Sequence, residues 1–147
     1  MSVFMTGDMW RVFDEVDYFV ITTNAIIKRN GAVVMGAGIA KQMRDKYPGI
    51  DVEIGKRIKA ECGSGGEYGL LLGNKVGAFQ VKHHYKDMAN LYLIKMAATS
   101  LEQEARANPD KTYALNYPGI GNGGLAPWAV APLLQNLPDN VQIWTFK

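Results

Sequence analysis

The chain has 147 residues, of which 48% are hydrophobic and 20% charged, enough to bury one sizeable core without cross-links. Its formal net charge of +2 is far below that of a dedicated nucleic-acid-binding protein. The single cysteine, Cys62, excludes an internal disulfide and fits a reducing compartment. Without a long apolar run or a secretion signal, we expect one cytoplasmic domain over residues 1–147 that does not associate with membranes.

The first third of the chain alternates two strands with a loop and a helix. Residues 2–6 are short and apolar, and residues 17–23 (DYFVITT) are β-branched and aromatic, which predicts a buried strand. Residues 24–37 are turn-rich and predict a long functional loop or a small hairpin. The pattern becomes helical over residues 38–46, until a Pro-Gly pair ends the helix.

The middle of the chain predicts a helix at residues 52–60, closed by the glycine-rich sequence CGSGG. Two strands follow at residues 68–72 and 76–82, and the Gly-Asn-Lys between them suits a tight hairpin turn. The clearest helix covers residues 89–106, where apolar side chains recur every three or four residues. We expect it to bury one stripe, formed by Leu91, Ile94, Ala98, Leu101 and Ala105.

The last third predicts a strand at residues 112–116, a glycine-rich loop at 117–125, a short helix at 127–136 and a strand at 141–146. Pro132 is expected to strain or shorten that helix. Strands that alternate with helices, with one hairpin, imply a layered α/β fold with a mixed sheet. Ligands of such folds bind at the carboxyl ends of the strands, where both glycine-rich loops are expected.

These two loops each lead into a helix and suggest a phosphate site. They are residues 36–40 (GAGIA) and 118–125 (PGIGNGGL). Free N–H groups at a helix start attract phosphate, and glycine lets it approach the backbone closely. One such loop is more often a plain turn, but two favour a diphosphate site. A P-loop lysine motif is absent, and Lys41 stands where a dinucleotide fingerprint needs its third glycine, which disfavours both of those chemistries.

Four segments in this order resemble the macro domain family, which binds ADP-ribose. They are GDMW after the first strand, TTN after the second, MGAGIAKQM, and PGIGNGGLAPWAVAPLL, and they span almost the whole chain. The resemblance implies a three-layer α/β/α sandwich with a mixed central sheet. It also implies ADP-ribose as the ligand, with no cofactor and no metal.

The resemblance assigns ligand roles to single residues. Asp8, backed by Met9, matches the family's carboxylate for the adenine amino group, and Trp144 on the last strand is a candidate to flank adenine. The asparagine near the distal ribose is either Asn24 or Asn30, because this segment differs in length from common family members. The two loops would clasp the pyrophosphate through Gly36, Ala37, Gly38, Ile39, Gly119, Ile120, Gly121, Asn122, Gly123, Gly124 and Leu125.

Each candidate also has a plain structural role open to it. Asp8 can cap a helical turn, Trp144 can belong to the core, and Asn24 can bond to its own backbone in a turn. The residues taken alone do not decide between these roles and ligand contacts.

Lys82 ends a predicted strand on the side where the ligand is expected. An unprotonated lysine is a nucleophile toward carbonyl-like carbon, although an exposed lysine is more often simply solvated. The segment resembles the strand-end lysine of macro domains that remove terminal ADP-ribose from proteins, and of antitoxin macro domains that remove it from DNA. In that branch the lysine is proposed to attack the anomeric carbon of the distal ribose; Asn24 is our second candidate catalytic residue. The loop sequence GNGGL is more like the DNA-acting antitoxins, and the aspartate of the protein-acting relatives is absent.

Two histidines follow this lysine. On a strand, His83 and His84 would point to opposite faces, so they do not predict a shared metal site. Together with Lys82, Tyr85 and Lys86 they would suit contacts with nucleic-acid phosphates and a base.

We therefore expect a monomeric macro domain that binds ADP-ribose and hydrolyses ADP-ribosyl linkages on a macromolecule, either DNA or protein. Two alternatives stay open: a phosphatase of ADP-ribose-1″-phosphate, and a reader module that binds ADP-ribose without turnover. A Lys82 side chain directed away from the cleft would favour the reader.

Overall fold

One mixed sheet organises the computed structural model, which describes residues 1–146. Its strand order is β1-β6-β5-β2-β4-β3, and all neighbours are parallel except the β3–β4 hairpin. The strands are β1 (Val3–Thr6), β2 (Tyr18–Thr23), β3 (Leu70–Leu72), β4 (Val76–Gln80), β5 (Tyr113–Asn116) and β6 (Val141–Thr145). The predicted mixed sheet and its hairpin are confirmed.

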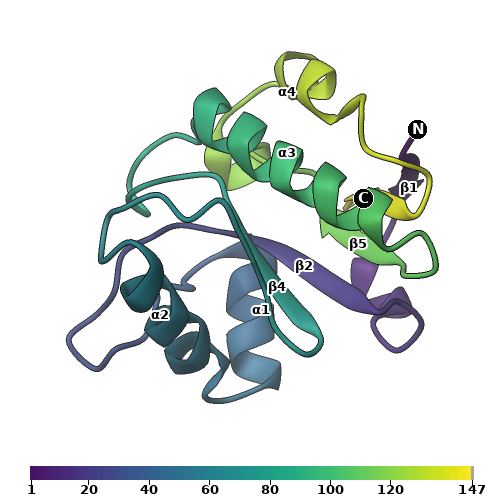
Figure 1. Ribbon diagram of the computed structural model, residues 1–147. Coiled ribbons are helices and arrows are strands. Elements are labelled where there is room, and N and C mark those ends of the chain that lie inside the picture. Colours follow the sequence, from purple (N-terminus) through teal and green to yellow (C-terminus); the bar gives the residue numbers. More distant parts are fainter. Residues whose placement is uncertain (147) are drawn as a thin grey trace.

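Helices cover both faces of this sheet, which gives the predicted three layers (Figure 1). Helices α1 (Gly38–Lys46) and α2 (Ile50–Glu61) lie on one face, and α3 (Leu91–Ala107) and α4 (Pro127–Leu134) lie on the other. Two short 3-10 helices, η1 (Met9–Val12) and η2 (Gly121–Gly123), were not expected. Within residues 1–146, no helix combines the length and the apolar character that crossing a membrane would require.

The core divides between the two faces, as the alternation of β2 requires. Phe19 and Ile21 point toward α1 and α2, while Val20 between them points toward α3 and α4. The buried stripe of α3 is formed by Leu93, Ile94, Ala97, Ala98, Leu101 and Ala105. The prediction for Leu91 was wrong: it is 43% exposed. It occupies the first helical position, before the stripe begins.

Side-chain caps and turns moved several predicted boundaries by one or two residues. Helix α3 begins at Leu91 rather than two residues earlier, because Asn90 Oδ1 accepts the N–H groups of Tyr92 and Leu93 at 2.8 and 3.2 Å. Strand β4 ends at Gln80, although the Val81 N–H still donates to the Thr23 carbonyl at 3.0 Å. Residues 24–37 contain the small hairpin, with one antiparallel bridge between Ile27 and Val33.

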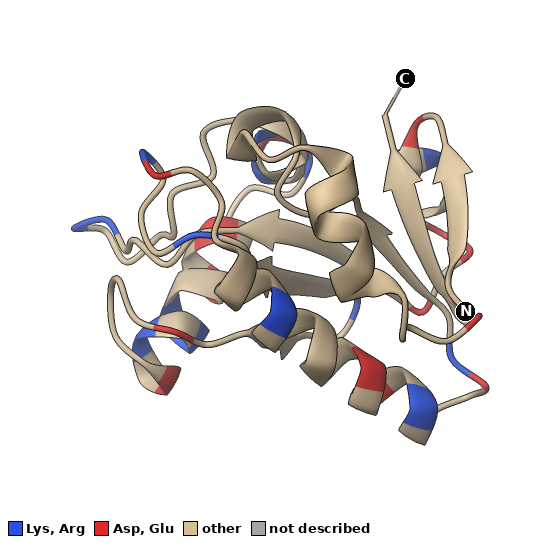
Figure 2. Ribbon diagram, turned by 90° about the horizontal axis from the view of Figure 1, so that it is seen from above, with Lys and Arg blue, Asp and Glu red and all other residues tan. Residues whose placement is uncertain are grey.

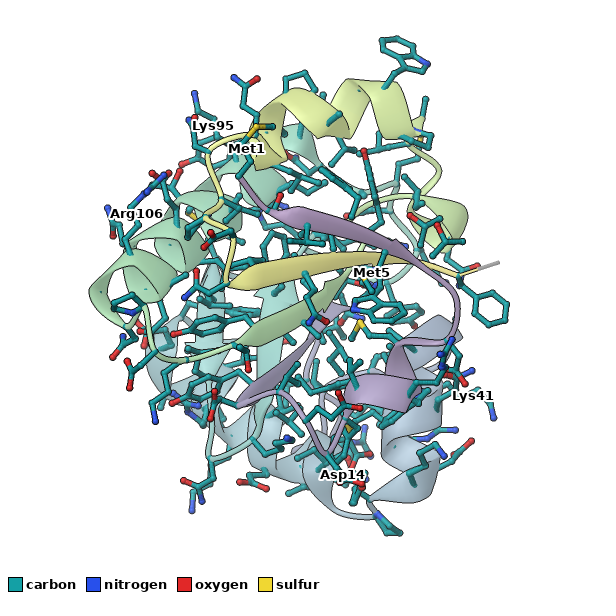
Figure 3. The ribbon with its side chains drawn as sticks, turned by 90° about the vertical axis from the view of Figure 1, so that its right-hand side faces the viewer. Met1, Met5, Asp14, Lys41, Lys95 and Arg106 are labelled. Atoms are coloured by element: carbon teal, nitrogen blue, oxygen red, sulfur yellow. The ribbon has the colours of Figure 1, made fainter. Side chains whose placement is uncertain are left out.

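Residues of both charge signs are distributed along the chain rather than concentrated in one element. Lysines and arginines are interspersed with aspartates and glutamates rather than gathered in one basic stripe (Figure 2). Figure 3 looks onto the β1 edge, where β1 carries Met5 and lies beside β6. This distribution agrees with the small net charge of +2.

We expect Gly55→Ala to destabilise the fold, although alanine normally stabilises a helix interior by about 1 kcal/mol relative to glycine. Gly55 lies on α2, where an added Cβ would overlap the Gly31 carbonyl oxygen and approach the Val33 backbone nitrogen to 2.8 Å. Backbone atoms cannot yield as a side chain would, so the free energy of unfolding should fall by about 2 kcal/mol. Urea denaturation measures it, with the exposed Lys59→Ala as control; equal or greater stability of Gly55→Ala would contradict this packing.

Candidate functional site

A cavity of about 830 Å³ opens at the carboxyl ends of the parallel strands. This volume lies within the range of about 300–1,000 Å³ of small-molecule sites. Every parallel strand contributes to its wall, and so do both glycine-rich loops. The lining ranges are 7–10 after β1, 22–24 at the end of β2, 34–40, 81–82 after β4, 116–117 at the end of β5, 119–123 and 144–146 at the end of β6, with Gln42 and Tyr85 in addition.

The first glycine loop presents unused backbone donors to this cavity. Ala37 is the N-cap of α1 and has no side chain that could accept a hydrogen bond. The N–H groups of Gly38, Ile39 and Ala40 therefore have no acceptor among residues 1–146. Gly38 has φ +58°, a conformation that glycine adopts without strain. An anion at this helix start would satisfy the donors and meet the positive end of the helix dipole.

The second glycine loop presents another set of unused donors opposite the first. Three of its N–H groups are used inside the loop, those of Gly123, Gly124 and Leu125. The N–H groups of Ile120, Gly121 and Asn122 bond to no acceptor in the described part of the chain. The loops approach closely, because a Cβ on Gly38 would lie 3.5 Å from Asn122 Nδ2. Thus the residues that carry two sets of free backbone donors line one cavity.

Asp8 combines the capping role with a place in the cavity wall. Its Oδ1 accepts the Trp10 N–H at 3.0 Å and caps η1, the structural role considered from sequence. Oδ2 accepts no hydrogen bond from residues 1–146, and the side chain is exposed. One carboxylate oxygen is thus held by the fold while the other is left to a ligand. Met9 beside it is buried and also lines the cavity.

Trp144 likewise belongs to both core and cavity. It is 4% exposed, and its indole N–H donates to Gln142 Oε1 at 2.9 Å. It packs in the core beneath α1 and α2 and also lines the cavity wall. It therefore offers a ligand part of its apolar ring and no free donor.

Of the two candidate asparagines, only Asn24 lines the cavity. Its Oδ1 accepts the Ile26 N–H and its Nδ2 donates to the Val34 carbonyl, both at 2.9 Å. These bonds hold both ends of the small hairpin, and one N–H of the Asn24 amide remains available to a ligand. Asn30 is not part of the cavity wall, and its Oδ1 accepts the Ala32 N–H at 3.1 Å in the hairpin turn. Gly124 and Leu125, predicted to touch the ligand, are also outside the wall.

Tyr68 fixes the strand end beside Asn24. Its hydroxyl donates to the Asn24 carbonyl at 2.8 Å and accepts from the Thr23 hydroxyl. Burial raises the pKa of Tyr68, so the phenol keeps the proton that it donates.

Lys82 projects into the wall of the cavity from the segment after β4. Its Nζ lies 3.4 Å from two backbone carbonyl oxygens, those of Tyr85 and Asn122. No carboxylate within residues 1–146 forms an ion pair with it. The four-carbon stem can therefore move Nζ into the cavity without breaking a salt bridge.

The two histidines have separate partners. His83 Nε2 lies 3.0 Å from Glu67, while the His84 ring stacks on Tyr85 with centroids 4.3 Å apart. They lie in the bend that follows β4, so strand alternation does not set their directions. Across the described residues, no three His, Cys, Asp or Glu side chains converge as a metal site would require.

The lining residues missed from the sequence include Trp10, Gln42, Asn116 and Tyr117. Asn116 clamps the end of β2, where its Oδ1 accepts the Thr22 N–H at 3.0 Å and its Nδ2 donates to the Thr22 hydroxyl at 2.8 Å. The only sequence signal for Asn116 was its place at the end of a predicted strand. Trp10 and Gln42 lie inside the motifs GDMW and MGAGIAKQM, but nothing in the sequence assigned a role to either side chain.

Two other features carry no comparable arrangement. A smaller cavity of about 240 Å³ lies between α2 and the hairpin, but its two cations are already bound to backbone carbonyls, Arg57 to Leu72 and Lys75 to Val16. Burial raises the pKa of the Cys62 thiol, which disfavours the thiolate that a nucleophile needs.

Solved structures with the same architecture include several macrodomains. DarTG of Thermosipho africanus, solved with ADP-ribose, matches with TM-score 0.74 and 23% identity over 100% of this chain and 42% of its own. The DarG macrodomain of Thermus aquaticus matches with TM-score 0.74 and 21% identity, over 100% of this chain and 98% of its own. That of Mycobacterium tuberculosis matches with TM-score 0.69 and 26% identity, over 98% of both chains. This chain has the macro domain fold.

The macro domain fold predicted from four ordered motifs is therefore confirmed, and the chain is similar in structure to the DarG macrodomains. No protein-family model matches the sequence, and no curated protein matches it. The chain spans less than half of the Thermosipho africanus protein and nearly all of the other two macrodomains. The roles of single residues stay predictions.

We expect Asn24→Ala to lower the free energy of unfolding by about 1–3 kcal/mol without any ligand, because it leaves the Val34 carbonyl and the Ile26 N–H without partners. Urea denaturation measures the loss. Asn122→Ala is the matched control, since the Asn122 side chain bonds to no residue among 1–146 and should cost little. Equal stability of both variants would show that Asn24 is not a structural residue.

Proposed function

We propose that this macro domain binds ADP-ribose, with the diphosphate between the two glycine loops. The observation that carries the proposal is the pair of facing donor sets, Gly38 to Ala40 and Ile120 to Asn122. Six free N–H groups around one cavity suit a ligand with two adjacent phosphates better than a single small anion. The ADP-ribose bound by the Thermosipho africanus protein supports this choice.

The ends of the cavity suit the two ends of such a ligand. Asp8 follows β1 and Lys82 follows β4, and three strands lie between β1 and β4 in the sheet. At about 4.8 Å per strand the two residues stand about 19 Å apart across the sheet. We place the adenine at Asp8, whose free oxygen would accept its amino group, and the distal ribose at Lys82.

We further propose that the chain hydrolyses an ADP-ribosyl linkage on a macromolecule, with Lys82 as nucleophile. The Nζ lone pair attacks C1″ and forms a C–N bond, and the bond from C1″ to the carrier breaks. The carrier leaves with that electron pair and takes up the proton that the amine gives up. Water then hydrolyses the lysine adduct, which restores the amine and frees ADP-ribose. The place of Lys82 in the cavity wall favours this over the reader.

We expect Gly36→Val to abolish ADP-ribose binding while the fold persists. Gly36 lines the cavity with an ordinary backbone conformation, and an added Cβ meets no protein atom within 4 Å. Valine would therefore fit the fold yet occupy space at the diphosphate. Calorimetry with ADP-ribose measures affinity and thermal unfolding verifies the fold, with Asn30→Ala as a control outside the cavity. Unchanged affinity would remove this loop from the site, and no binding by the unaltered chain would refute the proposed ligand.

We expect Lys82→Ala to lose turnover but keep ADP-ribose affinity. The unaltered chain is incubated with ADP-ribosylated DNA, ADP-ribosylated protein or ADP-ribose-1″-phosphate, and free ADP-ribose is followed by chromatography. Lys95→Ala is the control, because Lys95 is an exposed lysine on α3, outside the cavity wall. Turnover that survives Lys82→Ala would refute the nucleophile. Binding without turnover of any substrate identifies a reader, and exclusive action on the 1″-phosphate identifies a phosphatase.

A further inference from the structure

Trp10 and Gln42 are 32 residues apart in sequence and meet in the wall of the main cavity. The Trp10 indole N–H donates to Gln42 Oε1 at 2.7 Å. Trp10 belongs to η1, directly after Asp8, and Gln42 lies one helical turn after Gly38 on α1. Residues four apart share a helix face, so the Gln42 side chain lies on the same side of α1 as Gly38.

The fold sets the position of the indole without a ligand. Its ring packs on Phe19 and Phe13 at centroid distances of 4.6 and 5.5 Å. The Lys46 ammonium stands 5.0 Å from the ring centroid, a cation–π contact. The Trp10 backbone N–H is held by Asp8 at 3.0 Å. These contacts fix where the indole N–H points.

A fixed indole decides which way the glutamine amide faces. Indole nitrogen only donates, so Gln42 must turn its oxygen toward Trp10 and its nitrogen away. The Nε2 group of Gln42 donates to no acceptor within residues 1–146. The two N–H groups of Gln42 Nε2 are thus available in the cavity wall, and the bond to Trp10 fixes their orientation.

This donor pair joins the element that follows Asp8 to the helix that follows the first glycine loop. Asp8 precedes the helix that carries Trp10, and Gly38 begins the helix that carries Gln42. We propose that Gln42 is a specificity-determining residue whose Nε2 donates a hydrogen bond to an acceptor atom on the adenosine half of the ligand, with Trp10 as its positioning residue. This inference rests on ADP-ribose as the ligand.

The rival explanation is that Gln42 only ties η1 to α1. Two substitutions separate the roles. Gln42→Glu keeps an oxygen for the Trp10 N–H and has no donor for the ligand, whereas Gln42→Met has neither. Because glutamate also adds a negative charge, Lys41→Gln is the control: it changes the net charge equally at the adjacent position. Lys41 projects from α1 into solvent (Figure 3) and lies outside the cavity wall.

Calorimetry with ADP-ribose on the full chain tests the proposal. Loss of one net hydrogen bond corresponds to about five- to tenfold weaker binding. We expect this loss of affinity in both Gln42 variants. In Lys41→Gln the affinity should change less than about twofold, because exposed charges contribute little. The melting temperature of Gln42→Glu should be unchanged. Wild-type affinity in Gln42→Glu would overturn the proposal.

Nitrogen-15 NMR supplies a direct readout that a purely structural tie would not move. The side-chain amide pair absent from the Gln42→Glu spectrum belongs to Gln42. We expect this pair to shift when the unaltered chain is saturated with ADP-ribose. A pair that stays in place while backbone signals of Gly38 and Gly121 shift would overturn the role of Gln42 and leave the ligand intact. If no signal shifts at all, the ligand itself is wrong.

Discussion

The site depends on backbone N–H groups that the fold cannot satisfy by itself. Each such group needs an acceptor, and a helix start lacks one unless a side chain caps it. Side chains cap some helices, as Asn90 does for α3 and Asp8 for η1, whereas α1, α2 and α4 have no side-chain cap. At α1 the N-cap is Ala37, which cannot accept. The uncapped start of α1 lies beside a second loop whose N–H groups also have no acceptor among residues 1–146. An anion between them would satisfy both sets of donors.

The parallel sheet determines where this feature can occur. The carboxyl ends of β1, β6, β5, β2 and β4 all meet on one side, so the loops after them converge without any special contact between them. That convergence was predictable, because alternating strands and helices with right-handed crossovers leave few other topologies. The order of the motifs along the chain was therefore enough to predict the fold and the end of the sheet where the site lies.

Side-chain pairing was not predictable in the same way. Asn24 was the nearer match from sequence, but the sequence did not decide between it and Asn30, and only the hairpin shows that each satisfies a different backbone group. The Trp10–Gln42 bond joins residues 32 positions apart, and the contact of Gly55 with residues 31–33 depends on how α2 packs. Sequence periodicity reports which face of an element is buried and says nothing about which partner it meets. The extra helix η1 was missed because one turn has no periodicity to detect.

The structural and ligand roles weighed from sequence are not exclusive in this molecule. Asp8 uses one oxygen for η1 and keeps the other, and Gln42 gives its oxygen to Trp10 and keeps its nitrogen. In both residues the bond to the fold fixes the orientation of the atom that is left over. A ligand that meets such atoms does not have to order them, so less conformational entropy is lost on binding. The same bonds that make these side chains part of the fold would therefore make them selective for the ligand.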